Sequence, residues 1–264
     1  MNHGTRNAAV KGTFYPQTCS GLQTQFLSWN KQFKTPIENL DIKPRAIIVP
    51  HAGYIFSGYT ANAAYRFLQP TKPKRIIVIG PSHYHHFEGI SGSFYDAYET
   101  PCDPLQIDSA YLFALAKKFN LRFEPKAHER EHSTEVQMPI IGHYFPKTKV
   151  IELIYSDISD HALANLIIAL LQNGENIVVI SSDLSHFYPL NKAHELDNHC
   201  IEGIEAIDLD KLKGCEACGL AGIKAMVLAS QQFHLSSHII DYRTSAKTSG
   251  DTSSVVGYMS AVFY

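Results

Sequence analysis

Three apolar, strand-like runs in this chain each end in a turn that delivers a histidine. The turns present His51, His83 and His186, and each carries Pro, Gly or Ser. In open α/β sheets, ligands bind just beyond the carboxyl ends of the strands, so we expect the three imidazoles to share one site. Turns at strand ends are also where a scaffold presents chemistry. The pattern predicts a metal or catalytic centre.

Other polar residues close to these histidines compete for roles. His85 and His86 follow His83, but the backbone register that points His83 inward directs at least one of them elsewhere. Asp183 precedes His186 by three residues and is expected either to orient an imidazole or to act as a ligand itself. For any one of the 14 histidines, the alternative is a hydrogen-bonded residue of the core or surface.

Cys218 is the candidate for the anionic partner that two histidines need to hold a metal firmly. It lies just where a helix is expected to begin. A thiol at a helix N-terminus meets unpaired amides and the positive end of the helix dipole, which lowers its pKa and favours the metal-binding thiolate. An inert buried thiol is the alternative.

Cys215 and Cys218 also form a Cys-x-x-Cys pair, which is typical of a redox dithiol or of half a structural zinc site. A four-cysteine zinc site needs a second pair, and the other three cysteines are isolated. Five scattered cysteines, an odd number, favour reduced thiols over a disulfide framework.

The segment from His128 to His132 matches the zincin pattern H-E-x-x-H. That motif works only on a helix, where the two imidazoles lie one turn apart. From residue 126 to residue 137 only Ala127 and Val136 are apolar, so the segment has no face with which to pack as a buried helix. We expect a polar loop that enters a short helix near Ser133, from which His132 can still reach the site.

The elements that must position these residues alternate between strands and helices, which predicts a sheet covered by helices. Strands are expected at 45–49, 75–79, 149–155 and 176–181, and helices around 58–68, 108–119, 160–173, 192–206 and 219–233. Residues 238–243 and 255–264 read as two further strands joined by a polar loop, which predicts a mixed sheet. Since no Pro-, Gly- or Ser-rich linker divides the chain, residues 1–264 are expected to form a single domain.

The composition excludes several classes of partner. With 45% hydrophobic and 18% charged residues and a net charge of -2, the chain is an ordinary globular protein without the basic surface that nucleic acid requires. No stretch approaches the roughly 18 apolar residues of a membrane helix, and the segment from Met1 to Val10 lacks the apolar core of a signal peptide. We expect a cytoplasmic protein that binds neither nucleic acid nor membrane.

Together these segments resemble the Memo family, whose bacterial and archaeal branch is the B protein of the AmmeMemoRadiSam system. The resemblance runs from end to end. The matching segments are AVKGTFYP at 9–16, VPHAGYIFSG at 49–58, GPSH at 80–83, EHSTEVQMP at 131–139, SSDLSH at 181–186, ACG at 217–219 and TSGDTSSVVGY at 248–258.

The resemblance implies an α/β fold similar to the class III extradiol dioxygenases, with a central mixed β-sheet covered by helices on both faces. It also implies a metal site whose ligands are His51, His83 and Cys218, in agreement with the strand-end and thiol arguments. His186, with Asp183 behind it, would be the acid/base histidine, and His132 would line the pocket. The dioxygenase relatives hold iron with two histidines and a carboxylate, whereas here the third ligand would be a thiolate.

These observations predict a mononuclear iron or copper oxidoreductase of the LigB-like, dioxygenase-like type, with zinc as a further candidate metal. The aromatic residues that flank the candidate histidines read first as core or rim residues, and the alternative is that they sandwich a small aromatic or phenolic substrate. One alternative is a catalytically vestigial metal-binding adaptor, linked by the resemblance to a radical-SAM protein and a small companion protein. Another is a metallohydrolase that uses the same cleft.

Overall fold

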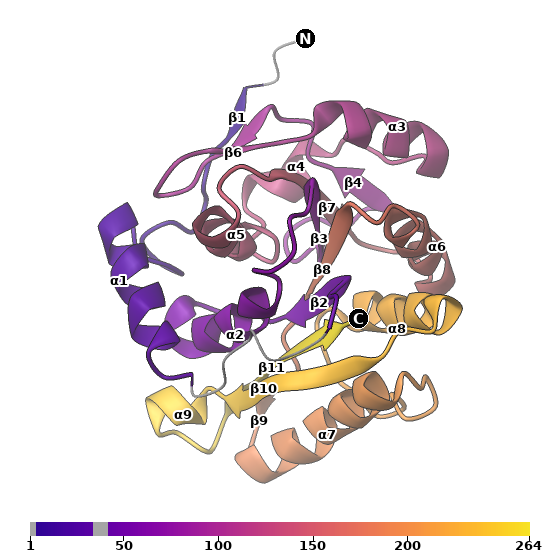
Figure 1. Cartoon of the computed structure of the whole chain (residues 1–264). Helices are drawn as coiled ribbons and strands as arrows, with labels where there is room; N and C mark the ends of the chain where they lie inside the picture. Colours follow the sequence, from indigo (N-terminus) through magenta and orange to yellow (C-terminus); the bar gives the residue numbers. More distant parts are fainter. Residues whose placement is uncertain (1–3, 34–41) are drawn as a thin grey trace.

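A mixed sheet runs through the centre of the molecule, and helices cover both of its faces (Figure 1). The structure is a computed structural model that describes residues 4–33 and 42–264. In spatial order the main strands are β10 (Ser237–Thr244), β11 (Val255–Phe263), β2 (Ala46–Val49), β8 (Asn176–Ser181), β3 (Arg75–Pro81), β7 (Lys149–Tyr155) and β4 (Ile90–Gly92), and β9 (His186–Tyr188) pairs with β11.

The four central strands β2, β8, β3 and β7 are parallel, and antiparallel strands flank them on both sides. Every residue of β2, β3 and β8 is buried. Runs that are apolar throughout, rather than alternating, are typical of parallel strands covered on both faces.

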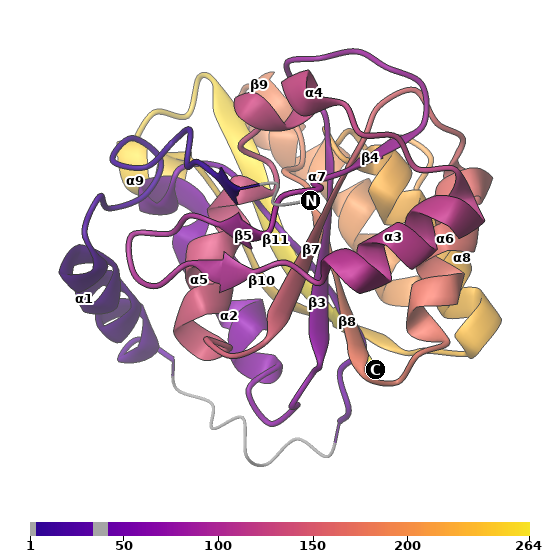
Figure 2. The same cartoon turned by 90° about the horizontal axis from the view of Figure 1, so that it is seen from above.

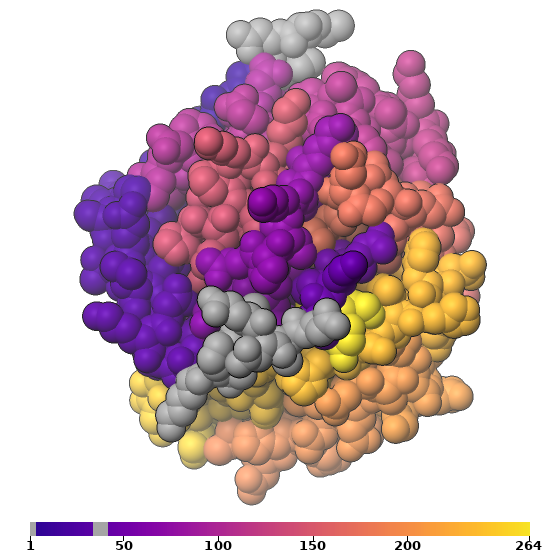
Figure 3. All heavy atoms as spheres, in the orientation of Figure 1, coloured from indigo at the N-terminus to yellow at the C-terminus, as the bar shows by residue number. Residues whose placement is uncertain are grey.

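The helices form two layers. Figure 2 shows α1 (Cys19–Asn30), α2 (Tyr59–Phe67) and α5 (Met138–Tyr144) on one side of the sheet, and α3 (Ser109–Phe119), α6 (Asp160–Leu171) and α8 (Leu220–Phe233) on the other. The space-filling view places α1 at the left edge and α7 (Leu190–Ala206), in orange, along the bottom (Figure 3).

Shorter elements complete the chain. Three two-residue strands form a separate small sheet in the order β1 (Thr5–Arg6), β5 (Ala97–Tyr98) and β6 (Leu105–Gln106). The remaining helical segments are α4 (Pro125–Glu129), α9 (Ala246–Ser249), the π-helix η2 (Tyr54–Gly58) and the 3-10 helix η3 (Glu135–Gln137). Within the described ranges, no helix has the length and apolar character needed to cross a bilayer.

The predicted fold class is confirmed, and the predicted strands at 45–49, 75–79, 149–155 and 176–181 correspond to β2, β3, β7 and β8. The expected helices correspond to α2, α3, α6, α7 and α8, and the two C-terminal strands are β10 and β11. The helices α1 and α5 and the small sheet were not predicted from the sequence. These elements are short or weakly patterned, so their packing partners rather than their own periodicity define them.

Candidate metal centre

The strand order brings two of the predicted histidines together. Because β8 lies directly between β2 and β3, the carboxyl ends of these parallel strands meet at one edge of the sheet. His51 follows β2, and His83 follows β3. The π-helix η2 begins three residues after His51, and such segments occur frequently at functional sites.

The third imidazole of the cluster belongs to His132, from the segment between α4 and η3. One ligand nitrogen each from His51, His83 and His132 lies within 4.8 Å of the other two. The ring centroids of His83 and His132 are 4.6 Å apart in a stacked arrangement, and His51 meets both rings edge-on. Small side-chain adjustments would bring these nitrogens within the ~2 Å bond length of one metal ion.

The hydroxyl of Ser181 fixes the tautomer of His51. Ser181 Oγ donates its only proton to the carbonyl oxygen of Ser133 at 2.5 Å. It must therefore accept the hydrogen bond of 3.0 Å from Nδ1 of His51, and Gln137 donates to the same oxygen. The lone pair of His51 consequently sits on Nε2. Burial, followed by the neighbouring His83, lowers the pKa of His51 to about 3, so the ring is neutral and able to bind a metal.

Glu131 fixes the tautomer of His83. Its Oε1 accepts a hydrogen bond of 2.8 Å from Nδ1 of His83, which leaves Nε2 as the free donor atom. Burial by itself would raise the pKa of Glu131, but the hydrogen bonds and charge of His83, with a bond from the Ser133 amide, outweigh burial and lower the pKa to about 2. This role of Glu131 was not predicted from the sequence. The available signal was its position directly before His132.

His132 contributes a buried nitrogen that lacks a partner. Its Nδ1 makes no hydrogen bond within the described part of the chain, and Glu131 Oε1 is 3.7 Å away. Burial, assisted by His51 and His83, lowers the pKa of His132 to about 4, so this ring is also neutral at ordinary pH. A buried polar atom without a partner is costly unless an ion or water completes it. The donor set therefore fits a bound cation.

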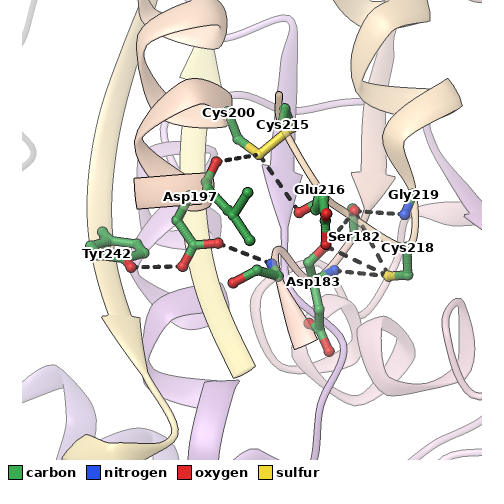
Figure 4. The surroundings of a disulfide bond; sticks show 11 residues. Ser182, Asp183, Asp197, Cys200, Cys215, Glu216, Cys218, Gly219 and Tyr242 are labelled. Atoms are coloured by element: carbon green, nitrogen blue, oxygen red, sulfur yellow. Dashed lines mark hydrogen bonds between the residues drawn. A yellow bond between two sulfur atoms is a disulfide. The ribbon is translucent and has the colours of Figure 1, made fainter. Parts of the chain in front are cut away.

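Cys218 lies against the cluster, with its Sγ 3.2 Å from Nε2 of His51. The thiol accepts a hydrogen bond of 3.3 Å from the amide of Asp183, and the amide of Gly219 donates to Ser182 Oγ at 2.9 Å (Figure 4). A Cβ at Gly219 would lie 2.6 Å from Cβ of Ser182, so only glycine permits this close approach of the Cys218 segment to the end of β8.

The predicted lowering of the Cys218 pKa is wrong for the chain without a metal. Burial is the largest effect, and with the nearby charge of Asp183 it raises the pKa of the thiol to about 12. The helix α8 begins only at Leu220, and its dipole does not compensate for this desolvation. A bound cation would be needed to hold Cys218 as a thiolate.

Asp183 positions the main chain of the site. Its Oδ1 accepts a hydrogen bond of 2.7 Å from the amide of His51. Within the described residues no hydrogen bond joins Asp183 to the ring of His186, although their charges interact. Burial raises the pKa of Asp183. Asp183 is thus seen to hold the backbone of His51, and its predicted catalytic role is untested.

His186 does not join the three-histidine cluster, but it lies close enough to His51 and Asp183 to interact with their charges. It begins β9, which pairs with β11, and its ring is partly exposed. It lines a cavity of about 350 Å³ together with Tyr188 and Glu216. The cavity gives this histidine access to solvent, and its role as a proton-transfer group stays a prediction.

The zincin reading of residues 128–132 is excluded by geometry. The helix α4 ends at Glu129, so the motif does not lie on one helix. Both ring nitrogens of His128 are occupied, Nδ1 by Glu152 and Nε2 by Ser91, each at 2.9 Å. His128 is a structural residue, and the metallohydrolase alternative loses the support of this motif.

The expected polar loop is nevertheless deeply buried. The fully buried carboxylate of Glu135 accepts hydrogen bonds from Arg6, from the amides of Ala9 and Val10, and from the hydroxyl of Tyr15. A segment this polar can be buried because the N-terminal residues satisfy it, and those contacts are remote in sequence.

The expectation of reduced, isolated thiols is wrong for four of the five cysteines. Cys19 pairs with Cys102, and Cys200 of α7 pairs with Cys215. Cys215 is therefore not the redox partner of Cys218, which is the free cysteine of the structure. Figure 4 shows the Cys200–Cys215 bond close to the Cys218 segment.

Comparisons with known proteins agree with this architecture. The family model described as "Memo-like protein" matches residues 6–262. A MEMO1 family protein of Sulfurisphaera tokodaii is 32% identical, over 98% of this chain and 99% of that protein. A MEMO1 family protein of Aquifex aeolicus is likewise 32% identical, over 98% of both chains.

A solved structure supports the fold. The crystal structure of the uncharacterized protein JW3007 from Escherichia coli K12 matches this chain with a TM-score of 0.55. The match covers 84% of this chain and 99% of the Escherichia coli chain. At 14% sequence identity, this likeness shows the fold alone. With a family model that spans nearly the whole chain and relatives of matching length, the chain belongs to the Memo-like protein family.

Proposed function

We propose that this protein is a mononuclear metal-dependent oxidoreductase in which His51, His83 and Cys218 bind an iron or copper ion. The observation that carries the proposal is the fixed orientation of two imidazoles. Nδ1 of His51 and Nδ1 of His83 are engaged by Ser181 and Glu131, so both Nε2 lone pairs remain for a metal. Imidazole suits iron, copper and zinc, and the soft sulfur of Cys218 favours copper, iron or zinc over magnesium or calcium.

The bound ion would supply redox and Lewis-acid chemistry, and the chain's own residues would orient the site and move protons. Asp183 holds the amide of His51, and Glu131 holds His83, so both imidazoles are positioned before a metal arrives. His186, at the partly exposed edge, is proposed to carry protons between the site and solvent. His132 is proposed to line the pocket and offers a further nitrogen to the ion.

Metal content tests the proposal directly. Protein purified anaerobically should retain stoichiometric iron or copper, and His51→Ala, His83→Ala and Cys218→Ala should each lose most of it. His161→Ala, a change at an exposed histidine of α6, should keep the wild-type content. Unchanged metal content in Cys218→Ala would remove this thiol from the ligand set.

Cobalt substitution separates the two candidate third ligands. A thiolate ligand gives an intense sulfur-to-cobalt absorption band, whereas three imidazoles do not. We expect the band in the wild type and in His132→Ala, and its loss in Cys218→Ser. A band that is absent from the wild type would leave His51, His83 and His132 as the ligands.

An aromatic or phenolic small molecule is the proposed substrate class. Oxygen uptake with a panel of phenols should depend on the metal and fall strongly in His186→Ala. The second candidate function is a catalytically vestigial metal-binding adaptor, to which the exposed apolar side chains of Phe187 (76%) and Ile55 (67%) would offer contact points for a partner. For the adaptor, the proposed setting is the cytoplasm and the proposed partners are a radical-SAM protein and a small companion protein. Sustained turnover that requires His186 would remove the adaptor-only view.

A further inference from the structure

We propose that Arg130 determines specificity at the mouth of the histidine cluster, and that it selects ligands in which a carboxylate is attached to a planar ring. The inference rests on the proposed function, because the other end of such a ligand would reach the metal held by His51 and His83. It adds a substrate class and a recognition residue to that site.

An exposed aromatic ring stands directly beside the cluster. Tyr84 follows His83 in the chain and is 51% exposed. Its ring centroid lies 5.8 Å from that of His132 and 6.4 Å from that of His83, edge-on to both. Large aromatic side chains are normally buried. The exposed ring of Tyr84, beside the three histidines, offers a surface on which a planar group can pack.

Arg130 lies over the same ring. Its guanidinium carbon is 5.3 Å from the centroid of Tyr84, within the range of a cation–π contact. The side chain is exposed, but its backbone is held firmly on the C-terminal side. The next residue, Glu131, is completely buried; its carboxylate binds His83, and its carbonyl oxygen accepts a hydrogen bond of 2.9 Å from Arg6. The position of Arg130 is thus tied to that of a proposed metal ligand.

No carboxylate neutralises this cation. Throughout residues 4–33 and 42–264, no acidic oxygen lies within 4 Å of the Arg130 guanidinium, whereas Arg6, Arg75 and Arg243 each bind one. Two acids flank Arg130 in sequence: Glu131 is already engaged by His83, and the exposed carboxylate of Glu129 makes no ion pair with Arg130 within 4 Å in the described residues. The guanidinium of Arg130 therefore lies exposed over Tyr84, beside the histidine cluster, with N–H donors to offer to a ligand.

The chemistry of these groups defines the ligand. A guanidinium binds a carboxylate through two parallel hydrogen bonds, which gives both affinity and orientation. The exposed ring of Tyr84 favours a planar body, and the imidazole cluster requires a donor atom at the far end. A hydroxylated aromatic carboxylate meets all of these requirements.

Two probes that differ in charge test the proposal on the full-length, metal-loaded protein. Affinities for 4-hydroxybenzoate and for neutral 4-hydroxybenzamide are measured by calorimetry and by the spectrum of the bound metal. We expect the wild type to prefer the carboxylate by about tenfold or more, since charge-assisted hydrogen bonds exceed neutral ones. Arg130→Gln should abolish the preference, and Arg130→Lys should keep part of it because the charge remains without the planar fork.

Arg122→Gln is the matched control. Arg122 is also exposed and faces Glu88 at 3.8 Å, so its loss should leave the preference for the carboxylate at the wild-type value. A wild type that binds both probes equally or binds neither, or an Arg130→Gln variant that keeps the preference, overturns the proposal.

The metal content of the same preparations distinguishes failure of the proposed metal-dependent function from failure of the proposed role of Arg130. If the wild type contains metal but binds the carboxylate and the amide with equal affinity, only the proposed role of Arg130 is contradicted, and the proposed function is not. Absence of metal from the wild type contradicts the proposed function, and titration of that metal-free protein with both probes then decides the role of Arg130 by the same criterion. Thermal unfolding of each variant checks that the fold is retained.

Discussion

Glu131 holds His83 at two points: Oε1 accepts the ring Nδ1–H at 2.8 Å, and Oε2 accepts the main-chain N–H at 2.6 Å. A single buried carboxylate thereby fixes the tautomer, the ring orientation and the backbone of a proposed metal ligand. Carboxylate–histidine–metal arrangements of this kind raise the basicity of the imidazole.

Removal of this carboxylate should weaken metal binding. We expect Glu131→Gln to raise the metal dissociation constant by about 10- to 100-fold, the usual effect of losing such a partner. Competition with a chromophoric chelator measures the change. Glu129→Gln, which alters the exposed glutamate of the same H-E-x-x-H segment, should bind metal like the wild type. Equal affinities in both variants would contradict the positioning role of Glu131.

The metal-free protein should lose stability as the pH falls below the ordinary pKa of histidine. Burial lowers the pKa of His51 from 6.5 to about 3, so the unfolded chain binds a proton in this window that the folded chain does not. Between pH 6.5 and about 3, His51 should therefore reduce the free energy of unfolding by up to about 1.4 kcal/mol per pH unit on acidification.

Urea unfolding at several pH values tests this slope. His51→Gln removes one of the two titrating imidazoles, the other being His132, and should reduce the slope, whereas His161→Gln, at an exposed position, should keep it. A His51→Gln variant with the full wild-type slope would show that other groups cause the pH dependence.

The free thiol of Cys218 should react slowly in the metal-free protein. With its pKa raised to about 12, only a small fraction is thiolate at pH 8, and the thiolate is the nucleophile. We expect alkylation by iodoacetamide to be at least about tenfold slower than in the unfolded chain, and to accelerate as the pH rises. Peptide mass spectrometry locates the modification. Rapid alkylation at neutral pH would instead support the lowered pKa expected from a helix N-terminus.

The disulfide Cys200–Cys215 should stabilise the fold and the proposed metal site together. It closes a loop with a sequence separation of 15, for which chain entropy predicts about 3 kcal/mol. The double change of Cys200 and Cys215 to Ala should lower the free energy of unfolding by about this amount in non-reducing urea titrations. It should also increase the rate of metal loss, because Cys215 lies three residues before Cys218.

The pair Cys19–Cys102, remote from Cys218 in the chain, provides the comparison. Changing both Cys19 and Cys102 to Ala should lower the free energy of unfolding. The rate of metal loss from the folded protein should stay close to that of the wild type. Five free thiols in the unreduced, unfolded chain would contradict both disulfides.

Local patterning was sufficient for most of the framework. The buried strands are rich in β-branched residues, which run without interruption from Ile177 to Ile180 in β8, so the bounds of β7 and β8 follow from the sequence alone. The helix α5 cannot be predicted from its sequence pattern, because Pro139 and Gly142 interrupt its seven residues. Tertiary packing overrides the weak helix propensity of that segment.

The sequence by itself determined where the candidate metal centre lies: His51 and His83 follow the strands that place them together, and Cys218 can be recognised as a candidate partner. Only the tertiary structure decided that His132 joins these two histidines while His186 lies at the edge, that Glu131 orients His83, and that Cys215 pairs with Cys200. The physical reason is separation along the chain. Periodicity specifies elements, whereas hydrogen bonds, desolvation and disulfides depend on which distant segments the fold presses together, as when Arg6 meets Glu135 across 129 positions.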